Sequence, residues 1–451
     1  MTRVDRPPGP KGHFLIGSFP LGQQDPLRTL TTWAGQYGDI FYYRAFNVPV
    51  YFLNRPDYLE AVLVTQSQNF IKGRGLQANR LLFGNGLLTS EGEFWQRQRR
   101  LAQPAFHRER IEVYGRTMVE CALRMIGEWT AGTTIEISRE MSRLTLEIVA
   151  RALFSADLRA RSGEVGRALA QVMAFNARGR MLMPLARNLP TPGNFRYHLA
   201  VKRLDRIIYD IIRKRREKPS GGDDLLSFFM AARDENGAAM PDRQLRDELM
   251  TLILAGHETT ALALSWTLYL LAGNPQVEEK LVAELNGVLA RRPPEAGDLT
   301  LMPYLAAVVK ESLRLYPPAF AIARIAVNDC EIGSYRIPAG ASVVMSQWVM
   351  HRDARFFHNP EAFIPERWLP NAGMDEQTNG RSIPRFAYFP FGGGPRTCIG
   401  SSFATVEASL ILATILQKFK LTLVPEHRVV VSSAITLRPK YGIRMIVANR
   451  T

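Results

Sequence analysis

Cysteine is scarce in this chain of 451 residues, which contains only Cys121, Cys330 and Cys398. So small and odd a number cannot supply the disulfide framework of a secreted scaffold, and it indicates a reducing compartment. Three thiolates are also too few for an iron–sulfur cluster, which is usually held by four. We therefore expect any functional cysteine here to act through its own chemistry.

Long apolar runs are lacking as well. No segment approaches the roughly 20 consecutive apolar residues that span a bilayer. The first residues, 1–6, contain no apolar core of a secretory signal. These absences predict a cytoplasmic protein without a transmembrane anchor.

Acidic residues are outnumbered by basic ones, and the formal net charge is +15. The hydrophobic fraction of 46% and the charged fraction of 22% exclude the disordered, collagen-like and coiled-coil classes. An excess of positive charge is typical of nucleic-acid binders. However, the densest basic run, Arg213–Arg216, ends an apolar helical pattern, where cations stabilise the helix C-terminus. We interpret this run as a solvated helix end and predict no nucleic-acid partner.

The order of the elements points to a mainly α protein. Aromatic, β-rich runs at 40–44 and 48–53 predict a hairpin. Helical periodicity dominates 91–291, and strand signals return at 335–350 and near the C-terminus, at 429–431 and 441–447. No repeat or linker divides the chain, so we predict one domain over residues 1–451.

The most specific segment is Phe391–Gly400, a glycine-rich loop that holds Cys398 just before a helical pattern at 402–419. Loop N–H groups and a helix N-terminus favour the thiolate, the form that binds metals. A single thiolate can ligate haem iron, whereas zinc takes four ligands. The alternative is that Cys398 is a small buried core residue.

This loop resembles the haem-binding signature of the cytochrome P450 family. The pattern FxxGxRxCxG is matched at every defined position, by Phe391, Gly394, Arg396, Cys398 and Gly400. The resemblance covers essentially the whole chain. It implies the mainly α, triangular P450 fold with small β-sheets, without a fused reductase domain. It also implies haem b as cofactor, with Cys398 as the iron ligand.

A second motif contains Glu311 and Arg314, three residues apart and so on one helix face. Taken alone, they would form a surface ion pair of little energetic value. The resemblance implies instead that they join Arg367 in a buried network that supports the fold.

A third motif lies within an apolar helix predicted at 249–271, whose uniform hydrophobicity indicates burial. A buried Glu258 needs a polar pocket or takes part in proton traffic, and Thr259 can bond back to the carbonyl of Ala255. The resemblance implies that Glu258 and Thr259 relay protons to dioxygen. It further implies that Ala255 and Gly256 border the haem.

Haem carries two propionates, which need cations or hydrogen-bond donors, and arginine offers a planar bidentate fork. By resemblance we expect Arg396 to bind them. Arg99, with Trp95 in a WxxxR arrangement, and Arg324 are expected to bind them as well.

The implied activity is insertion of one oxygen atom of O₂ into a C–H bond or alkene. The electrons are expected from a separate ferredoxin with its NAD(P)H-dependent ferredoxin reductase, or from a flavodoxin. Such acidic partners would be steered by Arg97, Arg100, Arg108 and Arg110. We expect the protein to be a monomer.

Other functions remain open on this fold. A peroxide-driven peroxygenase, or an isomerase or dehydratase, usually lacks the acid–alcohol pair that Glu258 and Thr259 match. A non-catalytic haem carrier has no evident use for a buried acid.

Apolar segments are expected to line the substrate pocket, at Leu76–Phe83, Met173–Met183, Pro318–Ile322 and Ala434–Leu437. Such a lining favours a lipophilic substrate, namely a fatty acid, terpenoid, steroid or carotenoid. The Ala255–Thr260 motif resembles that of fatty-acid-hydroxylating members, which favours long-chain substrates.

Overall fold

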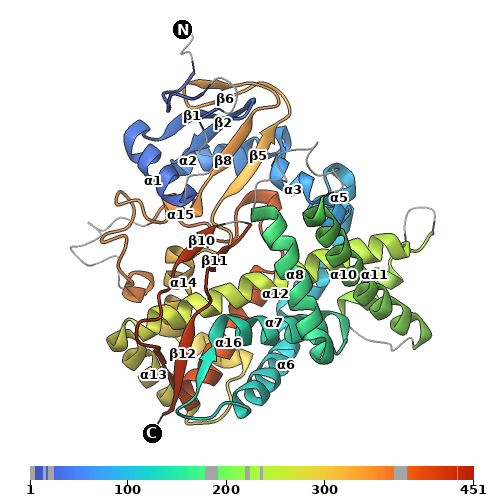
Figure 1. The fold of residues 1–451 in the computed structure, drawn as a ribbon, viewed down its shortest axis with the longest axis vertical. Coiled ribbons are helices and arrows are strands. Elements are labelled where there is room, and N and C mark those ends of the chain that lie inside the picture. The colour runs from blue at the N-terminus through green and yellow to red at the C-terminus, as the bar shows by residue number, and fades with distance from the viewer. Residues whose placement is uncertain are drawn as a thin grey trace.

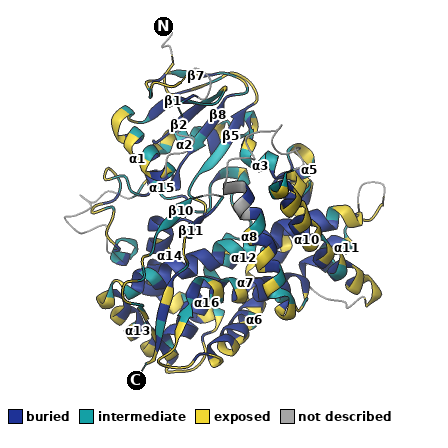
Figure 2. Ribbon diagram, viewed as in Figure 1, coloured by how far each residue is buried: buried dark blue, intermediate teal, exposed yellow. Residues whose placement is uncertain are grey.

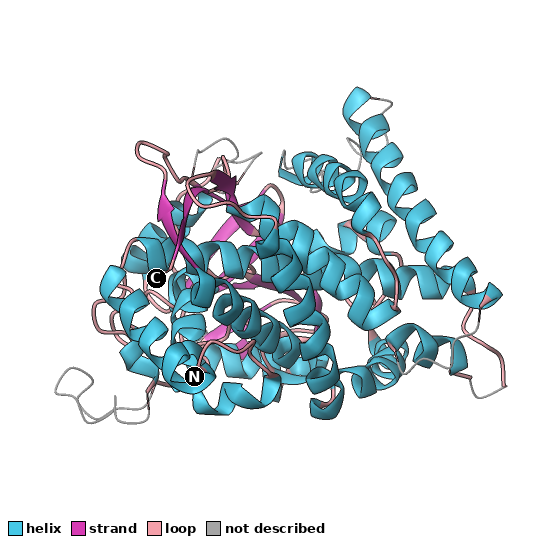
Figure 3. Ribbon diagram, turned by 90° about the horizontal axis from the view of Figure 1, so that it is seen from below, coloured by secondary structure: helices cyan, strands magenta, loops and turns pink. Residues whose placement is uncertain are grey.

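A computed structural model describes residues 6–13, 17–18, 25–177, 191–218, 224–233, 237–369, 383–433 and 435–450, without the side chains of 173, 174, 176 and 177. A β-sheet lies at the end near the N-terminus, and helices fill the rest, with the C-terminus at the opposite end (Figure 1). Seen from below, most of the ribbon is helical and the strands gather on one side (Figure 3).

The helices confirm the prediction of a mainly α chain. Those of the N-terminal half are α1 (Pro26–Tyr37), α2 (Pro56–Glu60), α3 (Arg74–Ala78), α4 (Arg80–Phe83), α5 (Gly92–Ala102), α6 (Arg108–Gly127), α7 (Ile137–Phe154), α8 (Ser162–Ala177) and α10 (Pro192–Glu217). Those that follow are α11 (Leu225–Ala231), α12 (Asp242–Ala272), α13 (Pro275–Leu289), α14 (Pro303–Leu315), α15 (Gln347–Met350) and α16 (Ser401–Lys418).

The strands are short. They are β1 (Ile40–Ala45), β2 (Val48–Leu53), β3 (Phe70–Lys72), β4 (Thr134–Glu136), β5 (Ile322–Ala326) and β6 (Cys330–Ile332). The remaining ones are β7 (Tyr335–Ile337), β8 (Ser342–Met345), β9 (Phe419–Leu423), β10 (Val431–Ser433), β11 (Leu437–Pro439) and β12 (Arg444–Asn449).

A five-stranded sheet with the order β1-β2-β8-β5-β3 joins distant parts of the chain. Its first two strands form the predicted antiparallel hairpin, with Ile40 opposite Leu53. Strand β8 pairs in parallel with β2 and antiparallel with β5. The prediction of strand through residue 350 is wrong at its end, because Ser346 caps α15 by accepting a hydrogen bond from the amide of Val349.

Helix α12 runs through the middle of the helical part and is buried along most of its length (Figure 2). It packs against α7, α10, α14 and α16. The predicted helices at 249–271 and 402–419 are both present, as α12 and α16. This packing places residues 255–260 in the centre of the protein.

The antiparallel hairpin of β10 and β11 lies between the large sheet and the helical part (Figure 1). Two hydrogen bonds fix it there. The indole Nε1 of Trp266 on α12 donates to the carbonyl of Leu437 over 2.9 Å, and the amide of Leu437 donates to the carbonyl of Pro318 over 2.9 Å. The hairpin therefore sits against the helix that carries Glu258.

The basic run at the end of α10 is largely neutralised by neighbouring carboxylates. Arg213 pairs with Asp210 and Glu217, and both of its partners lie on the same helix. The interpretation of this run as a solvated helix end is wrong for Arg215, because its side chain is buried against Asp224.

Candidate active site

The loop before α16 is folded by its own backbone hydrogen bonds. The amide of Cys398 donates to the carbonyl of Phe391, and the amide of Thr397 donates to that of Gly394, each over 3.0 Å. Gly400 is the N-cap residue of α16. Cys398 is thus held two residues before a helix N-terminus, where partial positive charge stabilises a thiolate.

Glycine at position 394 is required by close approach. Its φ is +66°, and a Cβ atom there would lie 1.7 Å from the carbonyl oxygen of Leu63. Any side chain would push the loop away from residues 61–65, which form the segment that it packs against.

Cys398 is deep in the protein and yet accessible. Burial raises the pKa of its thiol, while the amide of Gly400 and the charges of Arg99 and Lys72 lower it. Nevertheless, its side chain is exposed, whereas Cys121 is buried. A side chain that is both deep and accessible borders an internal space, which is the position an iron ligand needs.

Helix α12 also borders such a space at one turn. Ala255 is exposed and Gly256 and Thr259 are half-buried, although the helix is otherwise mostly buried. The hydroxyl of Thr259 donates to the carbonyl of Ala255 over 2.6 Å. Because its proton is used in this bond, the Thr259 oxygen keeps only its capacity to accept a hydrogen bond.

Arginines surround the cysteine loop. Arg99 Nη1 donates to the carbonyl of Thr397 over 2.7 Å. Arg396 lies 3.7 Å from the ring centroid of buried Trp95, pairs with Glu91, and donates to the carbonyl of Ser90 over 2.9 Å. Trp95 thereby fixes one of the nominated cations by stacking.

Two further cations lie opposite each other on β3 and β5, at Lys72 and Arg324. Both are buried. Burial, followed by the charge of the nearby arginines, lowers the pKa of Lys72 to about 7 and that of Arg324 to about 10. Like charges directly opposite across strands are destabilising, so this pair calls for an anion.

Lys72 was not predicted from the sequence. Among the described residues, neither it nor Arg324 forms an ion pair with a carboxylate, and Arg99 does not either. Only Glu91 lies in this cluster, and it pairs with Arg396. The surplus of positive charge fits the two propionates of a haem.

The residues present therefore fit haem, with an accessible thiol, a helix turn free of bulky side chains and an uncompensated cationic cluster. Comparison with known proteins agrees. The family model described as Cytochrome P450 matches residues 7–445. The chain belongs to the cytochrome P450 family.

Among curated P450s, this chain is 37% identical to cyclooctatin synthase of Streptomyces melanosporofaciens, over 93% of this chain and 91% of that protein. It is 34% identical to cyclooctat-9-en-7-ol 5-monooxygenase of the same species, over 91% and 88%. It is 33% identical to pentalenene oxygenase of Streptomyces avermitilis, over 94% and 93%. This P450 is a monooxygenase with haem b as its cofactor.

The structure brings the second motif of this P450 together as a network. The Glu311 carboxylate accepts from Arg314 over 2.8 Å and 2.9 Å and from Arg367 over 3.0 Å. Trp368, which sequence reasoning missed, donates to it over 2.8 Å. Glu311 and Arg314 are fully buried, so this is not a surface ion pair.

Glu258 has partners that the sequence did not reveal. Its Oε1 accepts a hydrogen bond of 2.7 Å from the hydroxyl of Thr436. The same oxygen forms an ion pair with the guanidinium of Arg438. Both partners belong to the β10–β11 hairpin and its turn, which lie 178 and 180 residues after Glu258 in the chain. No local sequence pattern could therefore have indicated them.

The other two polar residues of the motif, His257 and Thr260, make packing and hydrogen-bonding contacts. His257 Nε2 lies 3.1 Å from the hydroxyl of Ser142 on α7, and burial lowers the pKa of His257 to about 4. Thr260 donates back to the carbonyl of Gly256 over 3.1 Å.

The segments expected to line the substrate pocket differ in what the structure says of them. Leu76–Phe83 folds as part of α3 and as α4, and Pro318–Ile322 leads into β5. The bond from Leu437 to Pro318 joins the third and fourth segments. Residues 178–183 of Met173–Met183, and Ala434, lie outside the described residues.

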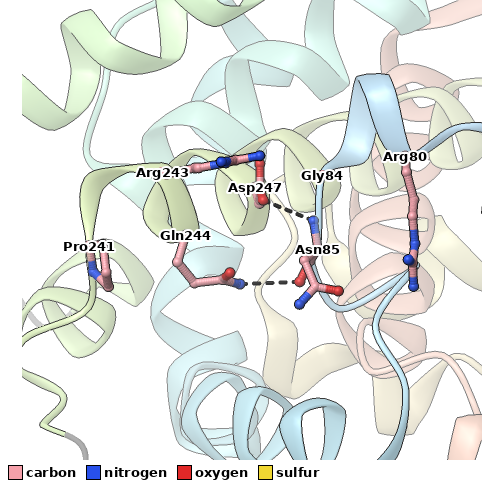
Figure 4. Close-up of a pocket in the computed structure, with 7 residues that line it drawn as sticks. All are labelled: Arg80, Gly84, Asn85, Pro241, Arg243, Gln244 and Asp247. Carbon is pink, nitrogen blue, oxygen red and sulfur yellow. Dashed lines mark hydrogen bonds between the residues drawn. The ribbon is translucent and has the colours of Figure 1, made fainter.

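A surface pocket of about 520 Å³ lies between the loop after α4 and the start of α12 (Figure 4). Asp247 accepts from the amide of Asn85 over 2.8 Å, and Gln244 donates to the Asn85 carbonyl over 3.2 Å. None of the candidate site residues lines this pocket. These contacts fasten the loop to α12.

Two features are absent from the described residues. No helix in them is long and apolar enough to cross a membrane, and they contain no cluster of three His, Cys, Asp or Glu that could hold a metal ion.

Proposed function

We propose that this cytochrome P450 oxygenates a terpenoid alkene or alkenol, with electrons from a separate ferredoxin or flavodoxin. The balanced reaction consumes substrate, O₂, two electrons and two protons, and gives the oxygenated product and water. The observation that carries the oxygenation chemistry is Cys398, an accessible thiol held deep in the protein at the start of α16.

When bound, the haem supplies activation of dioxygen, with the thiolate of Cys398 promoting cleavage of the O–O bond. The chain then has to hold the cofactor and deliver two protons. Arg99, Arg396, Arg324 and Lys72 bind the propionates, and Trp95 orients Arg396.

The glycines and the helix turn shape the space for the ring. Gly394 lets the loop pack closely on Leu63, Gly400 donates its amide toward the cysteine, and Phe391 accepts the bond from the Cys398 amide. On α12, Ala255 and Gly256 present almost no side chain and would leave room for dioxygen and substrate.

Proton delivery falls to Glu258 and Thr259. The Thr259 oxygen is an available acceptor because its own proton is donated to Ala255. It can orient a water molecule, and Glu258 can pass protons to that water. This acid–alcohol pair supports use of O₂ over the peroxide-driven alternative, in which the oxidant brings its own protons.

The terpenoid class is supported by the relatives. Cyclooctat-9-en-7-ol 5-monooxygenase and pentalenene oxygenase act on a terpenoid alkenol and alkene according to their names. Both cover about nine tenths of this chain. We therefore prefer a terpenoid to the long-chain substrate that the Ala255–Thr260 motif favours.

The docking surface for the redox partner rests mainly on Arg97 and Arg100. Both are exposed on α5, and neither forms an ion pair among the described residues. Arg108 is paired with Glu112 over 3.2 Å, and Arg110 lies over the ring of Phe228. Uncompensated positive charge speeds encounter with an acidic ferredoxin or flavodoxin.

The proposal is tested with the purified haem protein, a ferredoxin, its reductase and NADPH under ¹⁸O₂. Pentalenene and cyclooctat-9-en-7-ol serve as terpenoid probes, and palmitic acid serves as the long-chain probe. We expect one ¹⁸O atom in a terpenoid product and little product from palmitic acid. Turnover of palmitic acid alone, or a product without ¹⁸O, would contradict the proposal.

A further inference from the structure

The two oxygens of the Glu258 carboxylate have different surroundings. Oε1 accepts both the 2.7 Å hydrogen bond from Thr436 and the ion pair from Arg438. Among the described residues, Oε2 has no hydrogen-bond partner. One oxygen is thus anchored and the other is available to take up and release a proton.

The two residues that hold Oε1 belong to the β10–β11 hairpin and its turn, and not to α12, which carries Glu258. Arg438 lies on β11, and Thr436 lies in the turn before it. Leu437, the first residue of β11, accepts a hydrogen bond from Trp266 on α12 and donates one to the carbonyl of Pro318. The position of this hairpin therefore determines where the Glu258 carboxylate points.

The guanidinium of Arg438 is only partly satisfied by hydrogen bonds. Its Nε is buried without a hydrogen-bond partner, and its side chain remains 30% exposed. A buried donor that lacks a partner destabilises its own arrangement. The ion pair is therefore an arrangement that a small movement of the hairpin can change.

We propose that Arg438 and Thr436 are positioning residues for Glu258, and that by holding Oε1 they aim Oε2 at the water molecule that receives the proton. The proposal rests on the proposed function. The Glu258 carboxylate takes up a proton from solvent at Oε2 and passes it to a water molecule beside Thr259, which returns Glu258 to the carboxylate form. Without this anchor Oε2 is no longer held toward the water, and the two electrons and two protons convert O₂ to hydrogen peroxide.

The test compares Arg438→Gln, Arg438→Lys and Thr436→Val with Lys440→Gln. The last variant removes a cation from the same part of the chain, next to exposed Tyr441. With NADPH and O₂, we expect Arg438→Gln to lower product formed per NADPH about tenfold and to release peroxide. Arg438→Lys restores most of the coupling, Thr436→Val loses part of it, and Lys440→Gln behaves as the unaltered protein.

Two further measurements separate positioning from general damage. Turnover driven by hydrogen peroxide is expected to be unchanged in Arg438→Gln, since the oxidant already carries its protons. Amide hydrogen exchange at residues 431–433 and 435–438 is expected to be faster in Arg438→Gln and Glu258→Gln and unchanged in Lys440→Gln.

The outcomes distinguish this proposal from the function on which it rests. Full coupling in Arg438→Gln, an equal loss in Arg438→Lys, a parallel fall in peroxide-driven turnover, or unchanged hydrogen exchange would each overturn the positioning role. Absence of any oxygenated product from the unaltered protein would instead overturn the proposed function, while the hydrogen-exchange result would still decide whether Arg438 anchors the hairpin to Glu258.

Discussion

Arg99 Nη1 donates a hydrogen bond of 2.7 Å to the carbonyl of Thr397, the residue immediately before Cys398. This bond joins α5 to the loop that presents the thiol. The same side chain contributes positive charge that lowers the pKa of Cys398. The guanidinium therefore fixes the loop and places positive charge beside the thiol.

Replacing Arg99 by Leu is expected to weaken retention of haem by roughly 1.5–3 kcal/mol, the value of a hydrogen bond to a charged group. The measurement is the rate of haem transfer to apomyoglobin. Arg100→Leu is the matched control, because Arg100 is the exposed neighbour. Equal rates in the two variants would contradict the role of Arg99.

Lys72 gives a pH dependence to haem binding. Its pKa is about 7 because of burial and the neighbouring charges of Arg324 and Arg396. Propionates raise that pKa, so haem binding takes up a proton at Lys72 above about pH 7. Ligation by the Cys398 thiolate would release a proton, because burial raises the pKa of that thiol, and this opposes the uptake at Lys72 between pH 7 and 9. The contribution of Lys72 is therefore the difference in pH dependence between the unaltered protein and Lys72→Met.

This dependence is measured by titrating the apoprotein with haem at several pH values. Lys72→Met is expected to bind more weakly at pH 7, and its affinity is expected to rise more steeply with pH than that of the unaltered protein, because the group that takes up a proton on binding has been removed. A slope identical to that of the unaltered protein would show that Lys72 does not face the propionates.

Glu311 sits between two buried cations. Glu311→Gln leaves Arg314 and Arg367 without their counter-charge and is expected to destabilise the fold by roughly 3–5 kcal/mol. Urea denaturation of the haem protein measures it. Glu112→Gln is the control, since Glu112 and its partner Arg108 are both exposed, and its loss is expected to cost less than about 1 kcal/mol.

Thr259→Ala is expected to reduce product formed per NADPH on the order of tenfold and to raise hydrogen peroxide release. The variant removes the oxygen that accepts a hydrogen bond from water while leaving the helix intact. Thr259→Ser keeps this oxygen and is expected to remain coupled. Normal coupling in Thr259→Ala would mean that protons travel by another route.

The helices and the first hairpin could be predicted because their signals are local. The apolar periodicity of 249–271 and the alternation around Ile40–Leu53 need no knowledge of the rest of the chain. The loop that holds Cys398 could also be predicted, because its glycines and the helix that follows lie within a few residues of the cysteine.

What could not be predicted depends on distant pairing. Lys72 meets Arg324 only because β3 pairs with β5, and Glu258 meets Arg438 only because the C-terminal hairpin returns to α12. The error at residues 347–350 has a different cause. Apolar residues fit a strand, but the Ser346 side chain offers a helix cap.

The central claim is that Cys398 is the thiolate ligand of haem iron. The reduced, carbon monoxide-bound difference spectrum of the native protein tests it most directly, with Cys398→His as the comparison. We expect the red-shifted Soret band of thiolate-ligated haem in the unaltered protein and its loss in the variant. A band at the position of histidine-ligated haem in the native protein, or a red-shifted band that survives in Cys398→His, would contradict it.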